Sequence, residues 1–583
     1  MLRPSPGLRL ACTNFQHLSS REKALPLHKR FRPPESRCFT NTSATKKPKV
    51  DQVGNVAGEI DDGTPTKMVT APVDPESGNV GTHQVLSTPE GVWDATLSQT
   101  NINKNANKFY IMQLLHPNGN PESCTLYNRW GRTGEIGQSQ RKGPFEPVAA
   151  VREFKRQFKS KTATSWGDRV GMTAKKGHYY WIERSFEDDD HTPKAEESKQ
   201  KEKTPPEPES TLAVEIQTLC NLIFSEKLMN ETLSSMNYDA NKLPLGKLAK
   251  STILDGFAAL KVLAEVIQKP DGDAVKQFDN YLTACEELSG RYYSIIPHAF
   301  GRNRRPTIIA EMSTLKKELE LLDALGDMEI AKKLINSTIP VDEHGNALNP
   351  LDAHFRSLGL SYMEPVNPES REFAALEKYA HETHGAHHSY FKAQVQHAFR
   401  VERKCETDAW NDAGFDKTND GDRLLLWHGS RSTNFAGILS QGLRIAPPEA
   451  PASGYMFGKG VYFADMMSKS VGYCHASMSD QTGLLLLCEV VAKPFLEEVV
   501  GNYDADEDCM LGNKMSTKGM GKREPAAWQD AGEVLGRDDL RGCHMPTGRR
   551  KRGHPDAFLR YNEYIVYDVA QIRLRYLLMI KID

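Results

Sequence analysis

The sequence predicts a multidomain α+β protein. A disordered tail precedes a β-sheet-plus-helix domain, an all-α domain and a mixed α/β domain built on antiparallel sheets. Its 583 residues suffice for about three or four domains with separate cores. The spacing of apolar residues changes along the chain, from short runs to helical stripes and back to short runs. One polar stretch, 1–90, precedes these regions, and a second, 188–210, separates the first folded domain from the helical one.

The N-terminal stretch 1–90 is rich in Pro, Gly, Ser and Thr without periodicity, which predicts disorder. Its first fifty residues contain 11 Lys and Arg against 2 acids. This basic tail indicates an anionic partner, although a merely solvated end is the alternative. Residues 1–34 have the Arg-rich, acid-poor composition of a mitochondrial transit peptide. The KKPK run at 46–49 favours nuclear import instead.

Cysteine usage and hydropathy exclude several classes of protein. The ten cysteines form no C-x-x-C pair, which favours reduced thiols over disulfides or structural zinc. The histidines within 381–388 could bind zinc, but no carboxylate or cysteine completes the set, so we expect no metal. No apolar run approaches the length of a membrane span, so we expect no membrane partner.

A first folded domain is expected over 91–187. The runs 109–115 and 124–130 are typical of strands, and a helix should follow. Its apolar positions are Val148, Val151, Phe154 and Phe158.

Between these elements, Trp130, Gly131 and Arg132 lie in the glycine-rich segment 128–138. An aromatic plane beside a guanidinium can stack on a terminal base and pair with a phosphate. The alternative is that Trp130 packs in the core while Arg132 pairs with a local carboxylate.

After the linker 188–210, the segment 211–340 has helical periodicity. Pro244 suits the first turn of one helix. Two apolar stripes recur at spacings of three and four, which predicts buried helix faces. They are Ile253, Phe257, Leu260, Ala264 and Ile267, then Ile308, Met312, Leu315, Leu319 and Leu322.

The segment 350–583 contains short apolar runs separated by Gly- and Pro-rich loops, which predicts antiparallel sheets. One run ends at His428 and Gly429, where a bare backbone lets a planar ligand approach the N–H and C=O. Ser470 and Tyr473 follow with a hydroxyl and an aromatic face. Together these groups suit a flat amide-bearing ring such as nicotinamide.

The stretch 424–474 resembles the NAD-binding signature of the poly(ADP-ribose) polymerases, specifically the DNA-dependent nuclear members, over about fifty positions. The segment 91–187 resembles their WGR domain, and 211–340 resembles their regulatory helical domain. The overall plan is similar to the smaller members that lack N-terminal zinc fingers. The resemblance implies that the helices obstruct the cleft until something loosens them.

By this resemblance, the catalytic residues are His428, Tyr462 and Glu563 of the YNEYIVYD run. Glu563 would hydrogen-bond the ribose 2′-hydroxyl, stabilise the oxocarbenium-like charge and help to deprotonate the acceptor. The same resemblance implies a wider set of residues that bind NAD⁺. They are His428 on a ribose hydroxyl, Gly429 and Ser470 on the carboxamide, Ser430 beside them, Tyr462 and Tyr473 around the ring, Asn434 and Arg444 toward the adenosine half, and Lys469 beside Glu563 or at the acceptor site.

Neither a G-x-G-x-x-G unit nor a Walker motif occurs, so NAD⁺ is expected to be a consumed substrate. One departure from the family is the basic run 549–552, which could favour a polyanionic acceptor chain or DNA, or be merely solvated.

The expected activity is DNA-break-stimulated poly(ADP-ribosyl)ation of proteins, the chain itself included, in the nucleus during the DNA damage response. The expected partners are DNA ends or nicks, acceptor proteins and poly(ADP-ribose). The alternatives are a DNA-end-binding scaffold with an inert transferase fold, and a mono-ADP-ribosyltransferase or NAD hydrolase.

Overall fold

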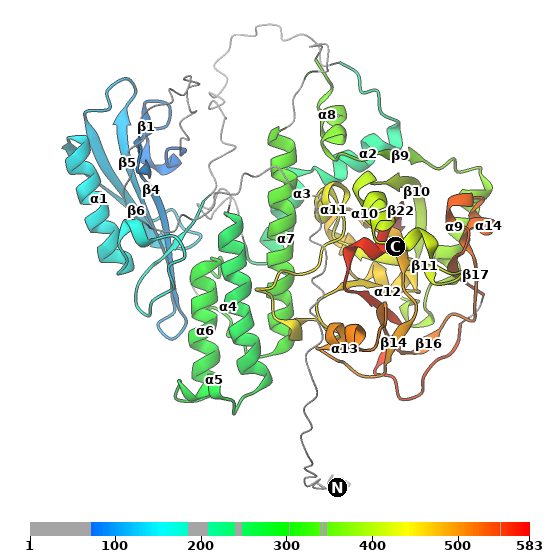
Figure 1. The fold of residues 1–583 in the computed structure, drawn as a ribbon. Coiled ribbons are helices and arrows are strands. Elements are labelled where there is room, and N and C mark those ends of the chain that lie inside the picture. The colour runs from blue at the N-terminus through cyan, green and yellow to red at the C-terminus, as the bar shows by residue number, and fades with distance from the viewer. Residues whose placement is uncertain are drawn as a thin grey trace, which may run out of the picture. The chain divides into compact units, whose positions relative to one another are not determined.

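A computed structural model describes residues 71–184, 208–238, 248–301, 304–337, 341, 347–548 and 550–583 (Figure 1). Pro244, Arg549, residues 1–70 and most of the linker lie outside these ranges. Within them, no helix combines the length and apolarity needed to cross a bilayer.

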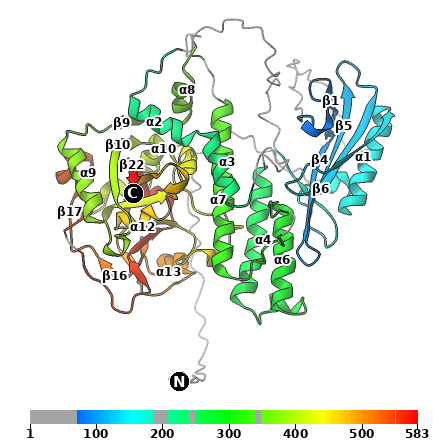
Figure 2. The same ribbon diagram turned by 180° about the vertical axis from the view of Figure 1, so that it is seen from behind.

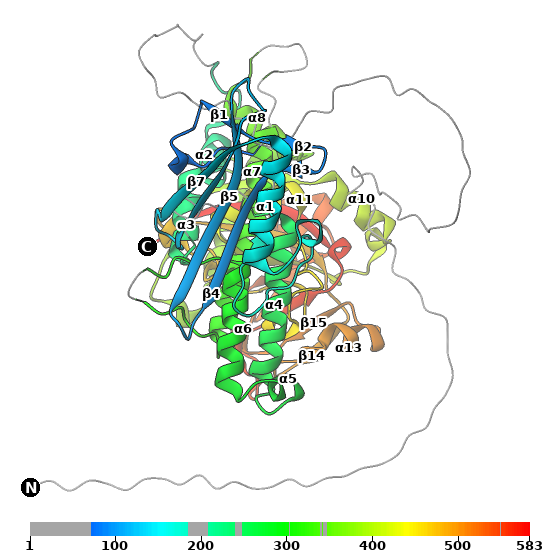
Figure 3. The same cartoon turned by 90° about the vertical axis from the view of Figure 1, so that its left-hand side faces the viewer.

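The first domain is a six-stranded antiparallel sheet in the order β7-β6-β5-β4-β8, with β1 paired to β5. The helix α1 contacts β5, β6 and β7 and lies across one face of the sheet (Figure 3). The elements are β1 His83–Val85, β4 Asp94–Asn101, β5 Ala106–Pro117, β6 Cys124–Arg132, β7 Gln138–Phe145, α1 Pro147–Thr162 and β8 Tyr180–Ile182, beside the small pair β2 Ser87–Thr88 and β3 Gly91–Val92.

The strands predicted at 109–115 and 124–130 are confirmed as β5 and β6. The predicted helix is confirmed too, with Phe154 and Phe158 fully buried. The assignment of Val148 to its apolar face was wrong, because Val148 is 73% exposed in the first turn, and Ala150 is buried instead.

The predicted disorder of 71–90 was also wrong. Asp74 caps a short 3₁₀ helix, Pro75–Ser77, and β1 extends the sheet. The Asp74 carboxylate is buried and pairs with the Arg129 guanidinium at 2.9 Å. The segment is also held to β5 and β6 by hydrogen bonds that a reading of its own residues could not reveal.

The second region is helical, and α4 packs side by side with α6 and α7 (Figure 2). Its elements are α2 Val214–Ile223, α3 Glu226–Ser235, α4 Lys250–Gln268, α5 Asp273–Lys276, α6 Tyr281–Ile295 and α7 Met312–Ser337, followed by α8 Pro350–Ser357. The first predicted stripe lies on α4, and the second lies on α7 from Met312 onward. Ile308 was wrongly included, because it precedes α7 and is 38% exposed.

The third region holds a seven-stranded mixed sheet in the order β17-β18-β11-β13-β22-β10-β9, a four-stranded sheet in the order β12-β21-β15-β14 and a three-stranded sheet in the order β19-β16-β20. Most neighbours are antiparallel, as predicted. The bounds are β9 Tyr362–Pro365, β10 Ala393–Glu402, β11 Arg423–Ser430, β12 Val461–Phe463, β13 Thr482–Val491, β14 Phe495–Glu498, β15 Ser516–Gly519, β16 Gly521–Glu524, β17 Ala527–Asp530, β18 Cys543–Thr547, β19 Lys551–Arg552, β20 Leu559–Tyr561, β21 Glu563–Val566 and β22 Ile572–Ile582.

The helices of this region are α9 Arg371–Glu382, α10 Lys404–Asp412, α11 Phe435–Gln441, α12 Met467–Val471, α13 Ala505–Leu511 and α14 Ala531–Leu535. The helix α7 packs against α11 and the adjoining 3₁₀ turn Ser432–Asn434. Apolar side chains from α7 and from this region form one continuous core cluster. The helical region is therefore held against the elements that carry the candidate site.

Candidate active site

The strand β11 ends at the rim of a cavity of about 1180 Å³ that is lined by residues of α4, α7 and the C-terminal region. His428 is half-buried there, and its Nδ1 lies 2.9 Å from the Tyr462 carbonyl oxygen. A carbonyl only accepts, so Nδ1 carries the proton and Nε2 is left as an acceptor. Burial lowers the pKa of His428, which keeps the ring neutral near pH 7. His428 can therefore accept a hydrogen bond from a sugar hydroxyl.

Gly429 lies where the backbone of β11 approaches that of α12. A Cβ at this position would stand 2.1 Å from the Ser470 carbonyl oxygen, a distance that no side chain tolerates. The buried Ser470 hydroxyl donates to the Trp427 carbonyl at 3.2 Å. The glycine is thus required for the close approach of α12 to β11, which places Ser470 beside the end of the strand.

Glu563 is the first residue of β21 and lines the same cavity as His428. Its Oε1 pairs with Lys469 Nζ at 2.8 Å, and both side chains are less than one-sixth exposed. Burial lowers the pKa of Lys469, while Glu563 opposes that shift. Lys469 also donates to the carbonyl of Tyr561 at 3.0 Å. One carboxylate oxygen is therefore fixed, and Oε2 has no hydrogen bond within the described part of the chain.

The residues on either side of Glu563 are anchored to a buried acid. Asn562 Nδ2 donates to Asp465 Oδ2 at 2.7 Å, and the Tyr564 hydroxyl donates to the same oxygen at 3.1 Å. Burial raises the pKa of Asp465 to about 6. Because both neighbours are held, the backbone of Glu563 has little freedom to move. Sequence analysis missed Asp465, which carries no motif of its own.

Two tyrosines flank the cavity. The Tyr462 hydroxyl accepts from the Phe457 N–H at 2.9 Å and donates to the Gly458 carbonyl at 2.8 Å, which fixes the ring. Tyr473 is 55% exposed at the opening. Burial of the hydroxyl, with Glu563 adding to the effect, raises the pKa of Tyr473 to about 12, so the phenol is neutral. The pair can bracket an aromatic ring.

The residues expected toward the adenosine half are held by protein groups. Asn434 is buried and donates through Nδ2 to Ser430 Oγ at 3.0 Å. Arg444 forms an ion pair with Asp327 of α7. Arg431, which sequence analysis missed, pairs with Glu320 of α7 at 2.9 Å. Two acids of α7 thus form ion pairs with two arginines at the cavity. No local sequence pattern indicates these ion pairs.

The candidate DNA-binding residues lie at the end of β6. The Trp130 ring is half-buried and stacks on Tyr110 at 5.9 Å between centroids. A Cβ on Gly131 would meet Gly137 Cα at 2.7 Å, so the tight approach requires glycine. The Arg132 guanidinium donates to the carbonyls of Asn105 at 2.8 Å and Gly301 at 2.9 Å. It also donates to the Arg304 carbonyl at 3.3 Å and to Asn105 Oδ1 at 3.2 Å, so its partners are neutral oxygens of this domain and of the helical region rather than a local carboxylate.

The histidines within 381–388 do not share a helix, because α9 ends at Glu382. His384 Nε2 lies 3.0 Å from the His388 carbonyl, and His388 Nδ1 lies 2.8 Å from Ser468 Oγ. These ring nitrogens are engaged within the protein, which does not favour a metal role for them.

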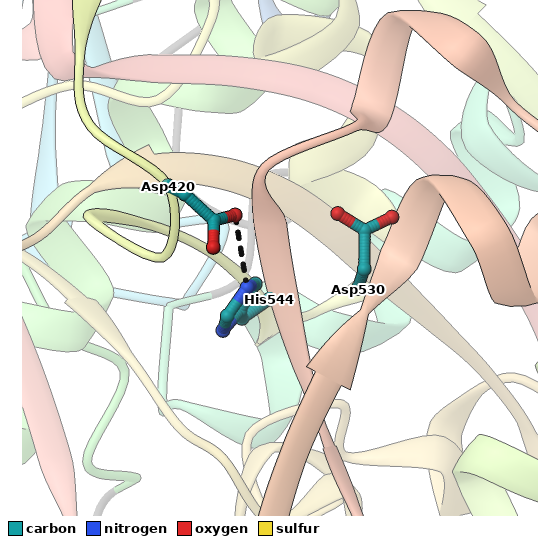
Figure 4. A group of neighbouring side chains, drawn as sticks. All are labelled: Asp420, Asp530 and His544. Atoms are coloured by element: carbon teal, nitrogen blue, oxygen red, sulfur yellow. Dashed lines mark hydrogen bonds and ion pairs between the residues drawn. The ribbon is translucent and has the colours of Figure 1, made fainter.

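A separate group of potential ligands, Asp420, Asp530 and His544, lies beside β18 (Figure 4). His544 Nε2 contacts Asp420 at 3.2 Å, while the Asp530 oxygens accept from the N–H groups of Glu533 and Gly542. Asp530 therefore serves the local backbone, and we assign this group no ligand.

Comparison with known proteins matches all three regions. Residues 93–173 match the WGR domain, 210–355 match the poly(ADP-ribose) polymerase regulatory domain, and 370–582 match the poly(ADP-ribose) polymerase catalytic domain. These matches define a multidomain ADP-ribosyltransferase. The chain belongs to the poly(ADP-ribose) polymerase family, which confirms the resemblance seen in the sequence and the predicted fold class.

Three relatives illustrate the extent of the similarity. The chain is 38% identical to poly [ADP-ribose] polymerase 2 of Arabidopsis thaliana, over 86% of this chain and 75% of that protein. It is 39% identical to poly [ADP-ribose] polymerase 2 of Homo sapiens, over 88% of this chain and 84% of that protein. It is 35% identical to poly [ADP-ribose] polymerase 1 of Gallus gallus, over 88% of this chain but 47% of that protein.

Proposed function

We propose that this chain is a DNA-break-stimulated enzyme that cleaves NAD⁺ and builds poly(ADP-ribose) on proteins, itself included. The observation that carries the proposal is the convergence of Glu563, His428 and Gly429 on one cavity. NAD⁺ is a consumed substrate here, and the proposal requires no metal. Family membership supports this assignment.

The residues act on the substrate as follows. His428 Nε2 accepts from a ribose hydroxyl, and the backbone of Gly429 with the Ser470 hydroxyl holds the carboxamide. Tyr462 and Tyr473 bracket the nicotinamide ring. Ser430, Asn434 and Arg444 lie toward the adenosine half. Together they fix the sugar relative to Glu563, which lowers the entropic part of the barrier.

The bond between the nicotinamide nitrogen and ribose C1″ breaks, its electron pair leaves with nicotinamide, and positive charge grows on the sugar. Glu563 Oε2 accepts from the 2″-hydroxyl and stabilises that charge where it develops. An acceptor oxygen then bonds to C1″ and gives up its proton, which Glu563 can assist. Lys469 holds Oε1, so Glu563 stays aimed at the cavity.

We propose that DNA ends or nicks bind at Trp130, Gly131 and Arg132 and regulate this reaction in the nucleus. The proposed DNA-binding domain covers 91–187, with 71–90 folded onto it, and the linker covers 188–210. The regulatory domain covers 211–340, and the catalytic domain covers 350–583. Ion pairs from α7 to Arg431 and Arg444 support an autoinhibitory role for the regulatory domain.

Incubation with labelled NAD⁺, with and without nicked DNA, tests the activity. We expect long labelled polymer on the protein only with DNA, and at least about 10²-fold less polymer from Glu563→Gln. Absence of both label on protein and nicotinamide release would indicate an inert scaffold. A single ADP-ribose per site would indicate a mono-ADP-ribosyltransferase, and free ADP-ribose would indicate a hydrolase. Deletion of 212–340 should give activity without DNA, and a folded but silent deletion would exclude autoinhibition.

A further inference from the structure

The short helix α13, Ala505–Leu511, has an uncovered surface outside the cavity described above. It contacts β14 and β15 of the four-stranded sheet and lies at the surface of the catalytic region (Figure 1). Ala505 and Cys509 are buried and stand one turn apart, so one side of the helix is packed against the sheet. The remaining surface carries Glu507, Asp508, Met510 and Leu511, all exposed. We call these four residues the α13 face.

The apolar part of this face is large for an exposed surface. Met510 is 80% exposed and Leu511 is 83% exposed. Val500 and Tyr503, in the loop that leads into the helix, are 57% and 43% exposed. Single exposed apolar side chains are ordinary, but a group of them within one short segment indicates a surface that contacts a partner.

Acids lie between these apolar side chains. Glu507 stands one turn from both Met510 and Leu511, and Asp508 stands one turn from Leu511. Acids in the first turn stabilise the N-terminal end of a helix, which accounts for the two carboxylates but not for the exposed Met510 and Leu511. The partner of this face must therefore suit acidic and apolar groups together.

The charge around the α13 face has one sign. Residues 494–513 contain six acids and no Lys or Arg. Within the described residues, Glu507 and Asp508 form no ion pair, and Lys518 of β15 pairs with Glu497 and Glu524. A cationic segment with apolar side chains complements this surface, because it supplies the missing counter-charges and covers the apolar groups.

The packed side of α13 adjoins the wall of the NAD⁺ cavity. Ala505 belongs to an apolar cluster that includes Phe457 and packs against Tyr462. In the loop before the helix, the Asn502 N–H donates to the Met456 carbonyl at 2.9 Å. Met456 and Tyr462 line the cavity. Only the helix and the segment 456–462 thus stand between the α13 face and the cavity, a thickness of roughly 15 Å.

We propose that the α13 face docks a Lys- and Arg-rich segment with apolar side chains on the acceptor protein. The inference rests on the proposed transfer of ADP-ribose to proteins. Cations of the segment pair with Glu507 and Asp508, and its apolar side chains cover Met510 and Leu511. A segment held there raises the effective concentration of neighbouring acceptor side chains at the cavity. The face therefore favours acceptors that carry such a segment.

The probe is a fluorescein-labelled helical peptide of Lys and Leu, with the Leu side chains along one face. Its binding to the full chain is measured by fluorescence anisotropy at physiological salt. Glu507→Gln/Asp508→Asn removes two exposed ion pairs with the peptide and should weaken binding about fivefold. Met510→Ser/Leu511→Ser removes the apolar contact and should weaken binding about tenfold.

Two matched controls carry the same changes elsewhere. Glu369→Gln/Asp412→Asn removes two exposed acids that have no ion pair among the described residues. Val214→Ser/Leu282→Ser removes two apolar side chains that are 72% and 62% exposed. Both controls should bind the peptide like the unmodified chain. Unchanged binding in both α13 variants overturns the proposal, and so does equal weakening in the controls.

A charge-swapped pair tests the recognition directly. Glu507→Lys/Asp508→Lys should lose the Lys–Leu peptide and bind a peptide in which Glu replaces every Lys. An unchanged preference for the Lys–Leu peptide overturns the proposal. Sedimentation that shows dimers of the unmodified chain, lost in the α13 variants while peptide binding persists, would make the face a contact between copies and also overturn it.

The effect on transfer is measured with the Lys–Leu peptide fused to a carrier protein. The two neutralising variants should release nicotinamide at the unmodified rate without the carrier, while labelling of the carrier falls about fivefold or more. Equal labelling of the carrier by the variants and the unmodified chain overturns the docking role. Because peptide binding is measured without NAD⁺, a chain that binds the peptide but releases no nicotinamide would refute the proposed function alone.

Discussion

Two ion pairs between α7 and the cavity rim make the proposed autoinhibition measurable. Glu320 pairs with Arg431 at 2.9 Å, and Asp327 pairs with Arg444. The double variant Glu320→Gln/Asp327→Asn removes both charges while keeping the size of each side chain. We expect it to favour an open state in which α7 leaves the cavity and NAD⁺ binds without DNA.

The free energy that these two ion pairs contribute follows from the exposure of their side chains. Glu320 is 49% exposed and Arg444 is 42% exposed, so water screens one partner of each pair. Such pairs are worth about 0.5–1 kcal/mol each, or about 1–2 kcal/mol together. With tenfold per 1.4 kcal/mol, the ratio of open to docked molecules should rise about 5- to 30-fold.

The assay is nicotinamide release without DNA, which should rise by that factor, while the rate at saturating DNA stays the same. Glu265→Gln on α4 is the matched control, because Glu265 is exposed and has no ion pair among the described residues. An unchanged basal rate in the double variant, with the fold intact, would refute the view that these pairs hold α7 in place.

Two further outcomes are expected. Gly429→Ala places a Cβ 2.1 Å from the Ser470 carbonyl oxygen, so nicotinamide release should fall about 10²-fold in initial-rate assays, and a fall below threefold would contradict the close approach. Asp74→Asn leaves the Arg129 charge buried without a counter-charge, which should cost about 3–5 kcal/mol and lower an unfolding transition in calorimetry. An unchanged transition would show that this ion pair adds no stability.

The features that the sequence predicts well are those that depend on residues close together in the chain. Apolar runs that end at a glycine or polar residue gave β5, β6 and β11, because a strand's pattern depends on its own two faces. Phe154 and Phe158 were placed correctly for the same reason, since α1 buries a single stripe.

What the sequence does not predict depends on partners far along the chain. Asp74 looks like part of a polar tail until Arg129, 55 residues later, supplies its counter-charge. Arg444 was expected to face the adenosine half, and its pairing with Asp327 depends on how α7 packs across 117 residues of separation. Val148 was misplaced because its spacing fits the stripe, yet the neighbouring elements leave its side chain 73% exposed.

The helical region contacts both the DNA-binding candidates and the NAD⁺ cavity, and this gives regulation a physical route. On one side, Ser294 of α6 accepts from the Thr100 N–H at 2.8 Å, and the Gly301 carbonyl accepts from Arg132. On the other side, α7 holds Arg431 and Arg444. A DNA phosphate is a stronger acceptor for Arg132 than a neutral carbonyl, because a guanidinium–phosphate bond is charge-assisted. When a DNA phosphate binds the Arg132 guanidinium, the hydrogen bond from Arg132 to the Gly301 carbonyl is lost. Because α6 and α7 both pack on α4, loss of this bond can shift the helices away from the docked state.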